Sequence, residues 1–280
     1  MHPRLTGSEG GTPTDDPGDR LVISSCSLPR DSLPAVLRAF AEVGYRRFEL
    51  FTDWAASCVD PAADDPDALR ALGDACGGMT FAALHLPRVL PGDRFAETLN
   101  TAIRAVRFAA AVGAEIVLLK AADIPTYVRA AGPVLDVAAP LGVTVVVQNH
   151  AGTALERPED VRAVLEGAGD ARLRPLLEVG HYHSAGVGWR AAVDALGDAI
   201  AYVHIKDQVG RQSVAFGAGE IDLPGLFVHL ERDRGYRGMY CIEMEVADPE
   251  NTVRYCRDAR EYVLRNLISP DTGEKKGATL

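Results

Sequence analysis

The chain has 280 residues, 47% of them hydrophobic, and carries 29 basic against 39 acidic side chains, a formal charge of −10. This length suits one large α/β domain, because barrels of this class commonly reach it without splitting. The acidic balance argues against a nucleic-acid partner, since binding to a polyanion depends on Lys and Arg. No apolar run is long enough to cross a bilayer and no signal peptide opens the chain, so we expect a cytoplasmic protein without membrane contact.

The two ends of the chain differ in composition from the rest. Residues 1–19 are rich in Gly, Pro, Asp, Ser and Thr, which predicts a disordered N-terminal tail, and residues 269–280 predict a flexible C-terminal tail. The five cysteines are scattered and odd in number, and none forms a C-x-x-C pair. The sequence therefore signals neither a disulfide framework nor a zinc knuckle.

Between the tails, residues 20–268 alternate short apolar runs with longer amphipathic stretches. Eight runs have strand character: Leu21–Ser25, Arg47–Phe51, Thr80–Leu84, Glu115–Lys120, Thr144–Gln148, Arg174–Glu178, Ala201–Ile205 and Met239–Glu243. Segments of helical period follow them, among them Leu33–Val43, Phe95–Val112, Pro158–Glu166 and Asn251–Leu267. Strands that alternate with helices indicate a parallel sheet with crossover helices.

Eight such units are the number that closes a (β/α)₈ TIM barrel, and this is the predicted fold for residues 20–268. A doubly wound open sheet is the alternative. That fold usually has fewer units and often opens with a Gly-rich phosphate loop, which is absent after the first strand.

Polar residues concentrate where the predicted strands end, which is where the active site of a TIM barrel lies. Five of the seven histidines fall in these positions: His85, His150, His181, His183 and His204. The other polar residues at strand ends include Glu49, Lys120, Gln148, Glu178, Lys206, Glu243 and Glu245. A lone strand-end His or Glu is more often a satisfied polar residue or an ion pair, so the prediction depends on their convergence.

Glu178, His204 and Glu243 are the core of the predicted site. They end the sixth, seventh and eighth strands and would point into one barrel mouth. Buried carboxylates repel one another and resist ionisation unless a cation holds them. Two carboxylates and one imidazole are a common set of ligands for a divalent metal, with positions left open for substrate oxygens.

Taken together, these residues resemble the sugar phosphate isomerase/epimerase superfamily of xylose isomerase-like barrels, which includes hydroxypyruvate isomerases, inosose dehydratases, ketose 3-epimerases and 3-dehydroshikimate dehydratases. The resemblance runs from Leu21 to Ile268. The segments that carry it are Gln148-Asn149-His150, Glu178-x-Gly180-His181, His204-Ile205-Lys206-Asp207, Gly217-Ala218-Gly219-Glu220-Ile221-Asp222 and Ile242-Glu243.

The resemblance implies one divalent metal ion, with Mn²⁺ or Mg²⁺ first and Zn²⁺, Co²⁺ or Fe²⁺ as alternatives. Position by position, the implied ligands are Gln148, Glu178, His204 and Glu243. Two of them depart from the family pattern, which has Glu at the first position and Asp at the second. Glu178 keeps the charge, but Gln148 removes one and cannot accept a proton as a carboxylate would.

Gln148 also bears on the chemistry, because a two-glutamate epimerase of this family needs a carboxylate there. The remaining residues suit proton transfer by a single base next to a carbonyl. Glu243 is the first choice for that base and His150 the second, since His150 lies two residues beyond Gln148 on the same side of the strand. We predict that His85, Lys120, His181 and Lys206 bind substrate oxygens or a phosphate; Lys206 could equally pair with Asp207.

The leading hypothesis is therefore a metal-dependent isomerase of a small polyhydroxylated substrate, a sugar or keto-polyol that could carry a phosphate. The alternatives are a metal-dependent dehydratase or lyase, a tailoring enzyme of secondary metabolism, and a sugar-binding barrel that has lost turnover. An abasic-site endonuclease of the same fold would need more metal ligands and a basic groove. A homo-oligomer fits any of these hypotheses.

Overall fold

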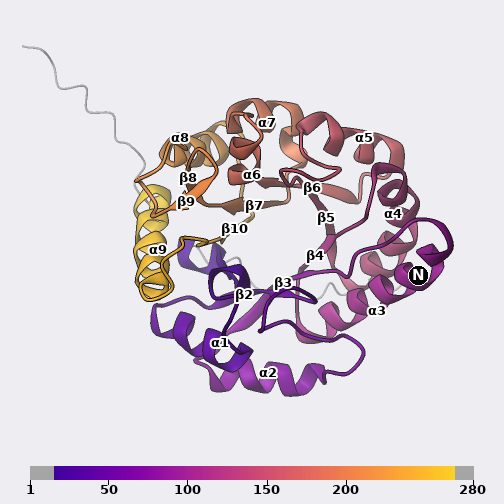
Figure 1. Cartoon of the computed structure of the whole chain (residues 1–280), viewed down its shortest axis with the longest axis horizontal. Coiled ribbons are helices and arrows are strands. Elements are labelled where there is room, and N and C mark those ends of the chain that lie inside the picture. Colours follow the sequence, from indigo (N-terminus) through magenta and orange to yellow (C-terminus); the bar gives the residue numbers. More distant parts are fainter. Residues whose placement is uncertain (1–15, 269–280) are drawn as a thin grey trace, which may run out of the picture.

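The computed structural model describes residues 16–268. Eight parallel strands close into a barrel in the order β1-β10-β7-β6-β5-β4-β3-β2, as Figure 1 shows. The strands are β1 (Leu21–Ser24), β2 (Arg47–Phe51), β3 (Thr80–His85), β4 (Ile116–Leu119), β5 (Thr144–Gln148), β6 (Leu173–Glu178), β7 (Tyr202–Ile205) and β10 (Met239–Ile242). The closed sheet confirms the predicted (β/α)₈ TIM barrel.

Helices surround the barrel as an outer ring (Figure 1). They are α1 (Leu33–Glu42), α2 (Pro66–Ala75), α3 (Phe95–Val112), α4 (Ile124–Ala138), α5 (Pro158–Ala168), α6 (Val179–Ser184), α7 (Trp189–Leu196), α8 (Leu223–Val228) and α9 (Thr252–Ile268). Five short 3₁₀ helices and one π-helical segment complete the described helices: η1 (Pro17–Arg20), η2 (Ser25–Ser27), η3 (Gly92–Arg94), η4 (Ala139–Leu141), η5 (Gly197–Ala199) and η6 (His229–Asp233).

The helix ends follow local chemistry. Pro34 stands in the first turn of α1, where a missing N–H costs nothing, and Pro158 does the same for α5. Helix α3 ends at Gly113, whose φ of 90° is left-handed and gives the chain its turn into β4. These signals are why the predicted helix boundaries lie within two residues of the observed ones.

Alternation along the strands divides the buried side chains into two layers. Residues such as Val117 and Leu119 of β4 face outward and pack under the helices, whereas Ile116 and Leu118 face the barrel interior. The interior cluster also contains Val22, Ala82, Ala83, Val146, Leu176, Tyr202, Met239 and Cys241. This apolar plug closes the barrel below its C-terminal mouth, so inward side chains further along each strand must meet above it.

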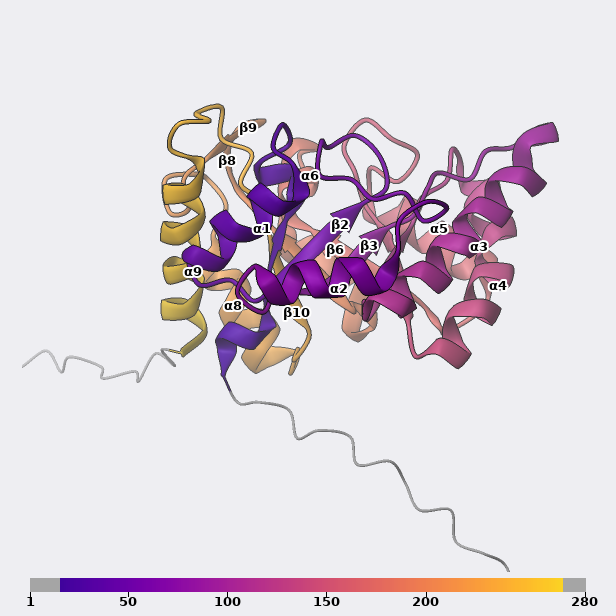
Figure 2. The same cartoon turned by 90° about the horizontal axis from the view of Figure 1, so that it is seen from below.

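Three features differ from the sequence prediction. Residues 17–19, assigned to the disordered tail, belong to η1, because the Asp16 side chain caps it and Arg20 bonds to Glu231. The predicted strand ends at Glu178 as expected, but helix α6, which was not among the predicted helices, begins directly after it. A hairpin of β8 (Asp207–Val209) and β9 (Gln212–Val214) follows β7; Figure 2 shows it at one end of the barrel, beside α9.

Residues 1–15 and 269–280, which include most of the predicted tails, lie outside the described residues. Within residues 16–268, no helix is both long and apolar enough to span a membrane.

Candidate active site at the barrel mouth

The inward positions at the C-terminal ends of the strands carry almost only polar side chains. In the strand register, His204 of β7 is paired with Glu178 of β6 on one side and with Cys241 of β10 on the other. Because alternate residues face the same way, Lys206 stands above His204 and Glu243 above Cys241. The polar residues that the structure brings together at this mouth are Glu49, His85, Gln148, Glu178, His204, Lys206 and Glu243.

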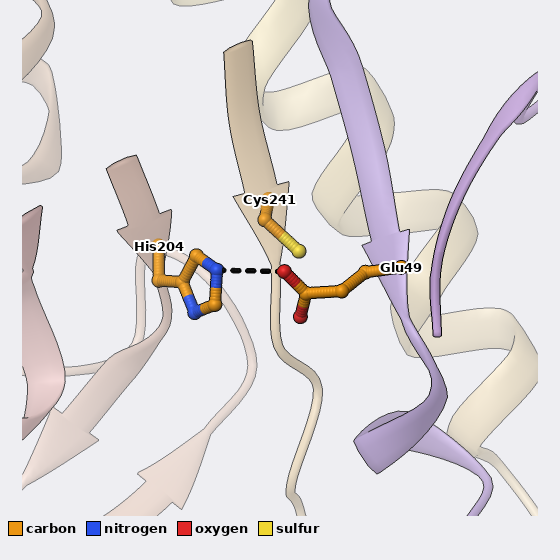
Figure 3. A group of neighbouring side chains, drawn as sticks. All are labelled: Glu49, His204 and Cys241. Atoms are coloured by element: carbon orange, nitrogen blue, oxygen red, sulfur yellow. Dashed lines mark hydrogen bonds and ion pairs between the residues drawn. The ribbon is translucent and has the colours of Figure 1, made fainter. Parts of the chain in front are cut away.

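Glu49 lies at the centre of this group, fully buried between two imidazoles. Its Oε2 lies 2.9 Å from His204 Nε2, in hydrogen-bonding geometry (Figure 3). Its Oε1 lies 3.1 Å from His85 Nε2. The second contact is too bent for a hydrogen bond, so we regard it as electrostatic. Burial raises the pKa of the Glu49 carboxyl, but the two imidazoles outweigh burial and hold that pKa well below its ordinary value.

His204 is bonded through both of its ring nitrogens. While Nε2 faces Glu49, Nδ1 lies 3.1 Å from Glu243 Oε1 and 3.4 Å from Gln148 Nε2. Burial lowers the pKa of the imidazole, but the Glu49 and Glu243 carboxylates outweigh burial and raise it to about 10. Nδ1 is thus the nitrogen that faces the mouth, and Glu49 fixes the ring in that orientation.

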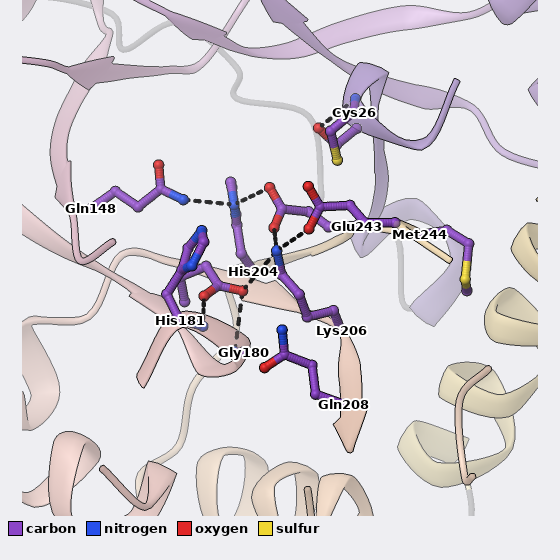
Figure 4. Close-up of polar contacts among 12 residues, drawn as sticks. Cys26, Gln148, Gly180, His181, His204, Lys206, Gln208, Glu243 and Met244 are labelled. Atoms are coloured by element: carbon purple, nitrogen blue, oxygen red, sulfur yellow. Dashed lines mark hydrogen bonds and ion pairs between the residues drawn. The ribbon is translucent and has the colours of Figure 1, made fainter. Parts of the chain in front are cut away.

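Glu243 is held by two cations. Its Oε1 pairs with His204, and its Oε2 lies 2.7 Å from the Lys206 ammonium, as Figure 4 shows. Burial raises the pKa of the carboxyl, but Lys206 and His204 more than reverse this and lower it well below its ordinary value. Oε2 is buried and accepts no hydrogen bond within residues 16–268.

Glu178 caps its own helix. Its carboxylate accepts hydrogen bonds from the backbone N–H groups of Gly180 and His181 in the first turn of α6, and its Oε1 lies 3.6 Å from Lys206 Nζ. Asn149 bonds both backbone groups of Glu178, at 2.9 Å each. Burial raises the pKa of this carboxyl, and Lys206 works against the rise.

Two histidines contact each other at the mouth: His150, which follows β5, and His181, which lies in α6. The ring centroids of His150 and His181 are 3.7 Å apart. The pKa of His181 falls to about 3, mainly through burial and then through the charge of Lys206, so this imidazole is neutral at pH 7. His150 Nδ1 lies 3.0 Å from the Ala151 carbonyl oxygen, which can only accept, so Nδ1–H donates in this contact and Nε2 is the ring nitrogen outside it.

A cavity of about 590 Å³ opens above these groups. It is lined by Gln148, His150, His181, Lys206 and Glu243, and further out by Phe51, Trp54, His85, Arg88, Lys120 and Tyr127. Lys120 pairs with Asp53 at 3.0 Å. The cavity size suits a small molecule, and its lining combines many polar and charged side chains with apolar ones such as Phe51 and Leu119, which suits a polar ligand.

The donor set at the mouth suits a divalent metal. Glu243 Oε2 is a buried carboxylate oxygen whose contact with the Lys206 ammonium is an ion pair without hydrogen-bond geometry, and the Glu243 and Gln148 side chains converge on His204 Nδ1. Among residues 16–268, the His, Cys and acidic side chains whose donor atoms lie within 4.8 Å of one another are Glu49, His204 and Cys241, a group that includes neither Glu178 nor Glu243 of the predicted ligands. Burial raises the pKa of the Cys241 thiol well above its ordinary value, and metals bind the thiolate, so this deeper group is the poorer site.

Comparison with known proteins identifies the class to which the fold and this mouth belong. The sequence profile of the xylose isomerase-like TIM barrel family matches residues 37–266, and the chain belongs to that family. The predicted resemblance is thereby confirmed.

The individual relatives are distant. Inosose dehydratases of Geobacillus thermodenitrificans and Bacillus licheniformis are 26% identical to the chain over 149 and 155 residues, which is 46% and 48% of this chain and 49% and 51% of theirs. The chain thus spans about half the length of the curated relatives it matches.

Among solved structures, similar folds include the IolI protein with a bound zinc atom (TM-score 0.72, 16% identity, 89% of this chain and 98% of that one). The D-allulose 3-epimerase from Methylomonas sp. gives a TM-score of 0.72 at 17% identity, again with 89% and 98% covered. Both solved structures are under 25% identical to this chain, so they show that the barrel fold is shared.

One residue at the centre of the mouth was not among the predicted site residues. Glu49 was noted only as a polar residue near a strand end, although a charged side chain between buried Phe48 and Leu50 was a signal that it faces the barrel interior. Conversely, His183 was counted with the mouth histidines but bonds Glu220 at 3.2 Å on the far side of α6. His85 is buried against Glu49, beneath the part of the cavity that Lys120 lines.

Proposed function

We propose that the protein catalyses proton transfer next to a carbonyl group in a small polyhydroxylated substrate, as a metal-dependent isomerase. The observation that carries this proposal is the Glu243 carboxylate, which lines a cavity of about 590 Å³ with Oε1 3.1 Å from His204 Nδ1 and with a buried Oε2 whose neighbour is the Lys206 ammonium. Such an oxygen is suited to a cation, and the cavity above it is suited to a substrate.

A divalent metal, when bound, would polarise the substrate oxygens and stabilise the negative charge of an enediolate. His204 through Nδ1 and Glu243 would hold it, with the Gln148 side-chain oxygen and Glu178 completing the set. Glu49 would keep His204 in the required tautomer by accepting from Nε2. Lys206 and His181 would hydrogen-bond substrate oxygens.

Of the two predicted bases, the contacts favour His150. Glu243 lies between two cations, which stabilise its charged form and make it a weak proton acceptor. The Nε2 of His150 is a lone-pair acceptor in an imidazole that lines the cavity, and its Nδ1–H is fixed by Ala151. His150 would remove the proton and return it to the neighbouring carbon, as an aldose–ketose isomerisation requires.

Dehydration is the second candidate function. It needs one group to take a proton and another to assist the departing hydroxyl, and the mouth holds two histidines in ring contact, His150 and His181. The relatives named as inosose dehydratases agree with this candidate.

The test is to incubate the Mn²⁺-loaded protein with inosose, D-allulose and D-fructose in D₂O. Isomerisation places deuterium on the substrate without loss of mass, whereas dehydration removes one water and creates an absorbing enone. Replacing His150→Gln should abolish either reaction, and His183→Gln, the matched control outside the cavity, should preserve it. The proposal would be contradicted if protein that is shown to hold metal exchanged no substrate proton for deuterium with any ketose or inosose tested.

A further inference from the structure

Lys206 is a deeply buried cationic side chain of the mouth, with an exposure of 1%. Its ammonium lies 2.7 Å from Glu243 Oε2, 2.5 Å from Glu245 Oε2 and 3.6 Å from Glu178 Oε1. Burial lowers the pKa of the amine, but these three carboxylates outweigh burial and raise it well above its ordinary value. The positive charge of Lys206 thus forms ion pairs with three carboxylates, which lie at the ends of β6 and β10.

The path of the Lys206 side chain is fixed by the backbone of α6. A Cβ atom at Gly180 would lie 2.4 Å from Lys206 Cγ and 2.6 Å from its Cδ. The glycine therefore leaves room for the aliphatic part of Lys206 to run against the helix, which delivers the ammonium to Glu243. The position of the charge is a property of the packing and does not depend on the ion pairs alone.

The same carboxylates serve two cations. Glu178 and Glu243 are proposed metal ligands, and Glu243 Oε2 is the oxygen that the ammonium already contacts. Two positive charges that share an oxygen repel each other, and the repulsion is strong where water is excluded. Gln148 adds to the effect, because it contributes no negative charge to the metal position.

We propose that Lys206 is an internal counter-cation that competes with the divalent metal for Glu243. Its ammonium neutralises the mouth carboxylates, lowers their affinity for metal, and must move away from Glu243 Oε2 when the metal binds. Glu245, 37% exposed at the cavity edge, is the partner that retains the displaced ammonium. This inference rests on the proposed metal site.

The experiment measures metal affinity by calorimetric titration of the full-length, EDTA-dialysed protein with Mn²⁺ and with Zn²⁺. Lys206→Met and Lys206→Gln should bind each metal about tenfold more tightly than the wild type, which corresponds to about 1.4 kcal/mol of binding free energy. In EDTA both variants should melt at a lower temperature, and saturating Mn²⁺ should restore the loss. The amide of Lys206→Gln can still hydrogen-bond Glu243, which protects the fold if Lys206→Met does not accumulate.

Lys120→Met is the matched control, because it removes an ammonium from the same cavity that pairs with Asp53 instead of a metal ligand. Its metal affinity should stay within about twofold of the wild type. Equal or weaker affinity in both Lys206 variants would overturn the competition, as would tightening of the same size in Lys120→Met. If neither the wild type nor the variants bind metal, the inference fails together with the metal site.

The failure of the proposed function is distinguishable from these outcomes. It would be seen as metal binding that responds to Lys206 as expected, in a protein that exchanges no substrate protons. Conversely, the metal-loaded wild type could exchange substrate protons while the Lys206 variants bind metal with the same affinity as the wild type. That result would contradict only the competition between Lys206 and the metal.

Discussion

Replacing Glu49→Gln tests whether the buried carboxylate organises the mouth. The amide has almost the same shape as the carboxylate, so the cavity and the packing stay the same. What changes is the negative charge between His85 and His204, both of which lie within 3.1 Å of the Glu49 oxygens. The substitution therefore isolates the electrostatic contribution of Glu49 from its volume.

The magnitude follows from the burial of the group. A hydrogen bond to a charged partner contributes about 1.5–3 kcal/mol, and breaking a buried ion pair costs about 3–5 kcal/mol. Because the amide can keep one hydrogen bond to His204, we expect a loss of ~3 kcal/mol in the free energy of unfolding. For a domain near this size, that corresponds to a fall in Tm of roughly 6–12 °C.

The assay is thermal and urea unfolding followed by circular dichroism at pH 7 in EDTA, so that metal binding does not contribute. Glu115→Gln is the control, since it removes an exposed carboxylate that pairs with Arg47 and should change stability by less than about 1 kcal/mol. If Glu49→Gln melts within 2 °C of the wild type, its loss in unfolding free energy is roughly under 1 kcal/mol. That result would refute the view that Glu49 holds His204 in place.

Three further predictions concern the same mouth. The pKa of His204 is raised to about 10, so its stabilising charge is fully present below pH ~6.5 and is lost as pH rises toward 10. The difference in unfolding free energy between the wild type and His204→Gln, measured in EDTA, should shrink over that pH range. A difference that stays constant would contradict this. Gln148→Glu adds a carboxylate at the metal position and should tighten Mn²⁺ binding about tenfold in calorimetry; weaker binding would count against the ligand assignment. Trp54 is 64% exposed at the cavity edge and has a left-handed φ of 78°. In the Trp189→Phe variant Trp54 is the only tryptophan, so the fluorescence of that variant should shift to the blue when a substrate binds and covers Trp54. An unchanged spectrum would place Trp54 outside the site.

The fold could be predicted because its signals are local and repeated. Strand β10 was expected at Met239–Glu243 and lies at Met239–Ile242, and helix α3 was expected and found at Phe95–Val112. Apolar periodicity and end residues such as Gly113 act over a few positions, and eight repeats leave little choice of architecture. The convergence of Glu178, His204 and Glu243 followed from that architecture, because parallel strands end at one edge of the barrel.

The details of the site could not be predicted in the same way. Whether Glu178 points at a metal or caps α6 depends on where β6 ends, and the turn into the helix is decided by Asn149, which bonds the Glu178 backbone from a neighbouring strand. The β8–β9 hairpin depends on Asp207, whose carboxylate accepts from the backbone N–H groups of Gly217 and Gly219 ten and twelve residues away. Such contacts between distant residues leave no periodic trace in the sequence.

The charges of the mouth explain why Gln148 is tolerated. The family pattern places a carboxylate at that position, and its loss would leave a metal with fewer negative ligands. In this chain a carboxylate is present two residues beyond Glu243, at Glu245, where it contacts Lys206 instead of His204. Glu245 thus brings a negative charge to the side of the mouth that holds the ammonium, whereas Gln148 brings none to the side that faces His204 Nδ1. Because attraction between charges falls with distance, this arrangement strengthens the hold on Lys206 and weakens the hold on a metal. A mouth of this kind would bind its metal weakly and exchange it readily, with Lys206 ready to neutralise Glu243 whenever the metal leaves.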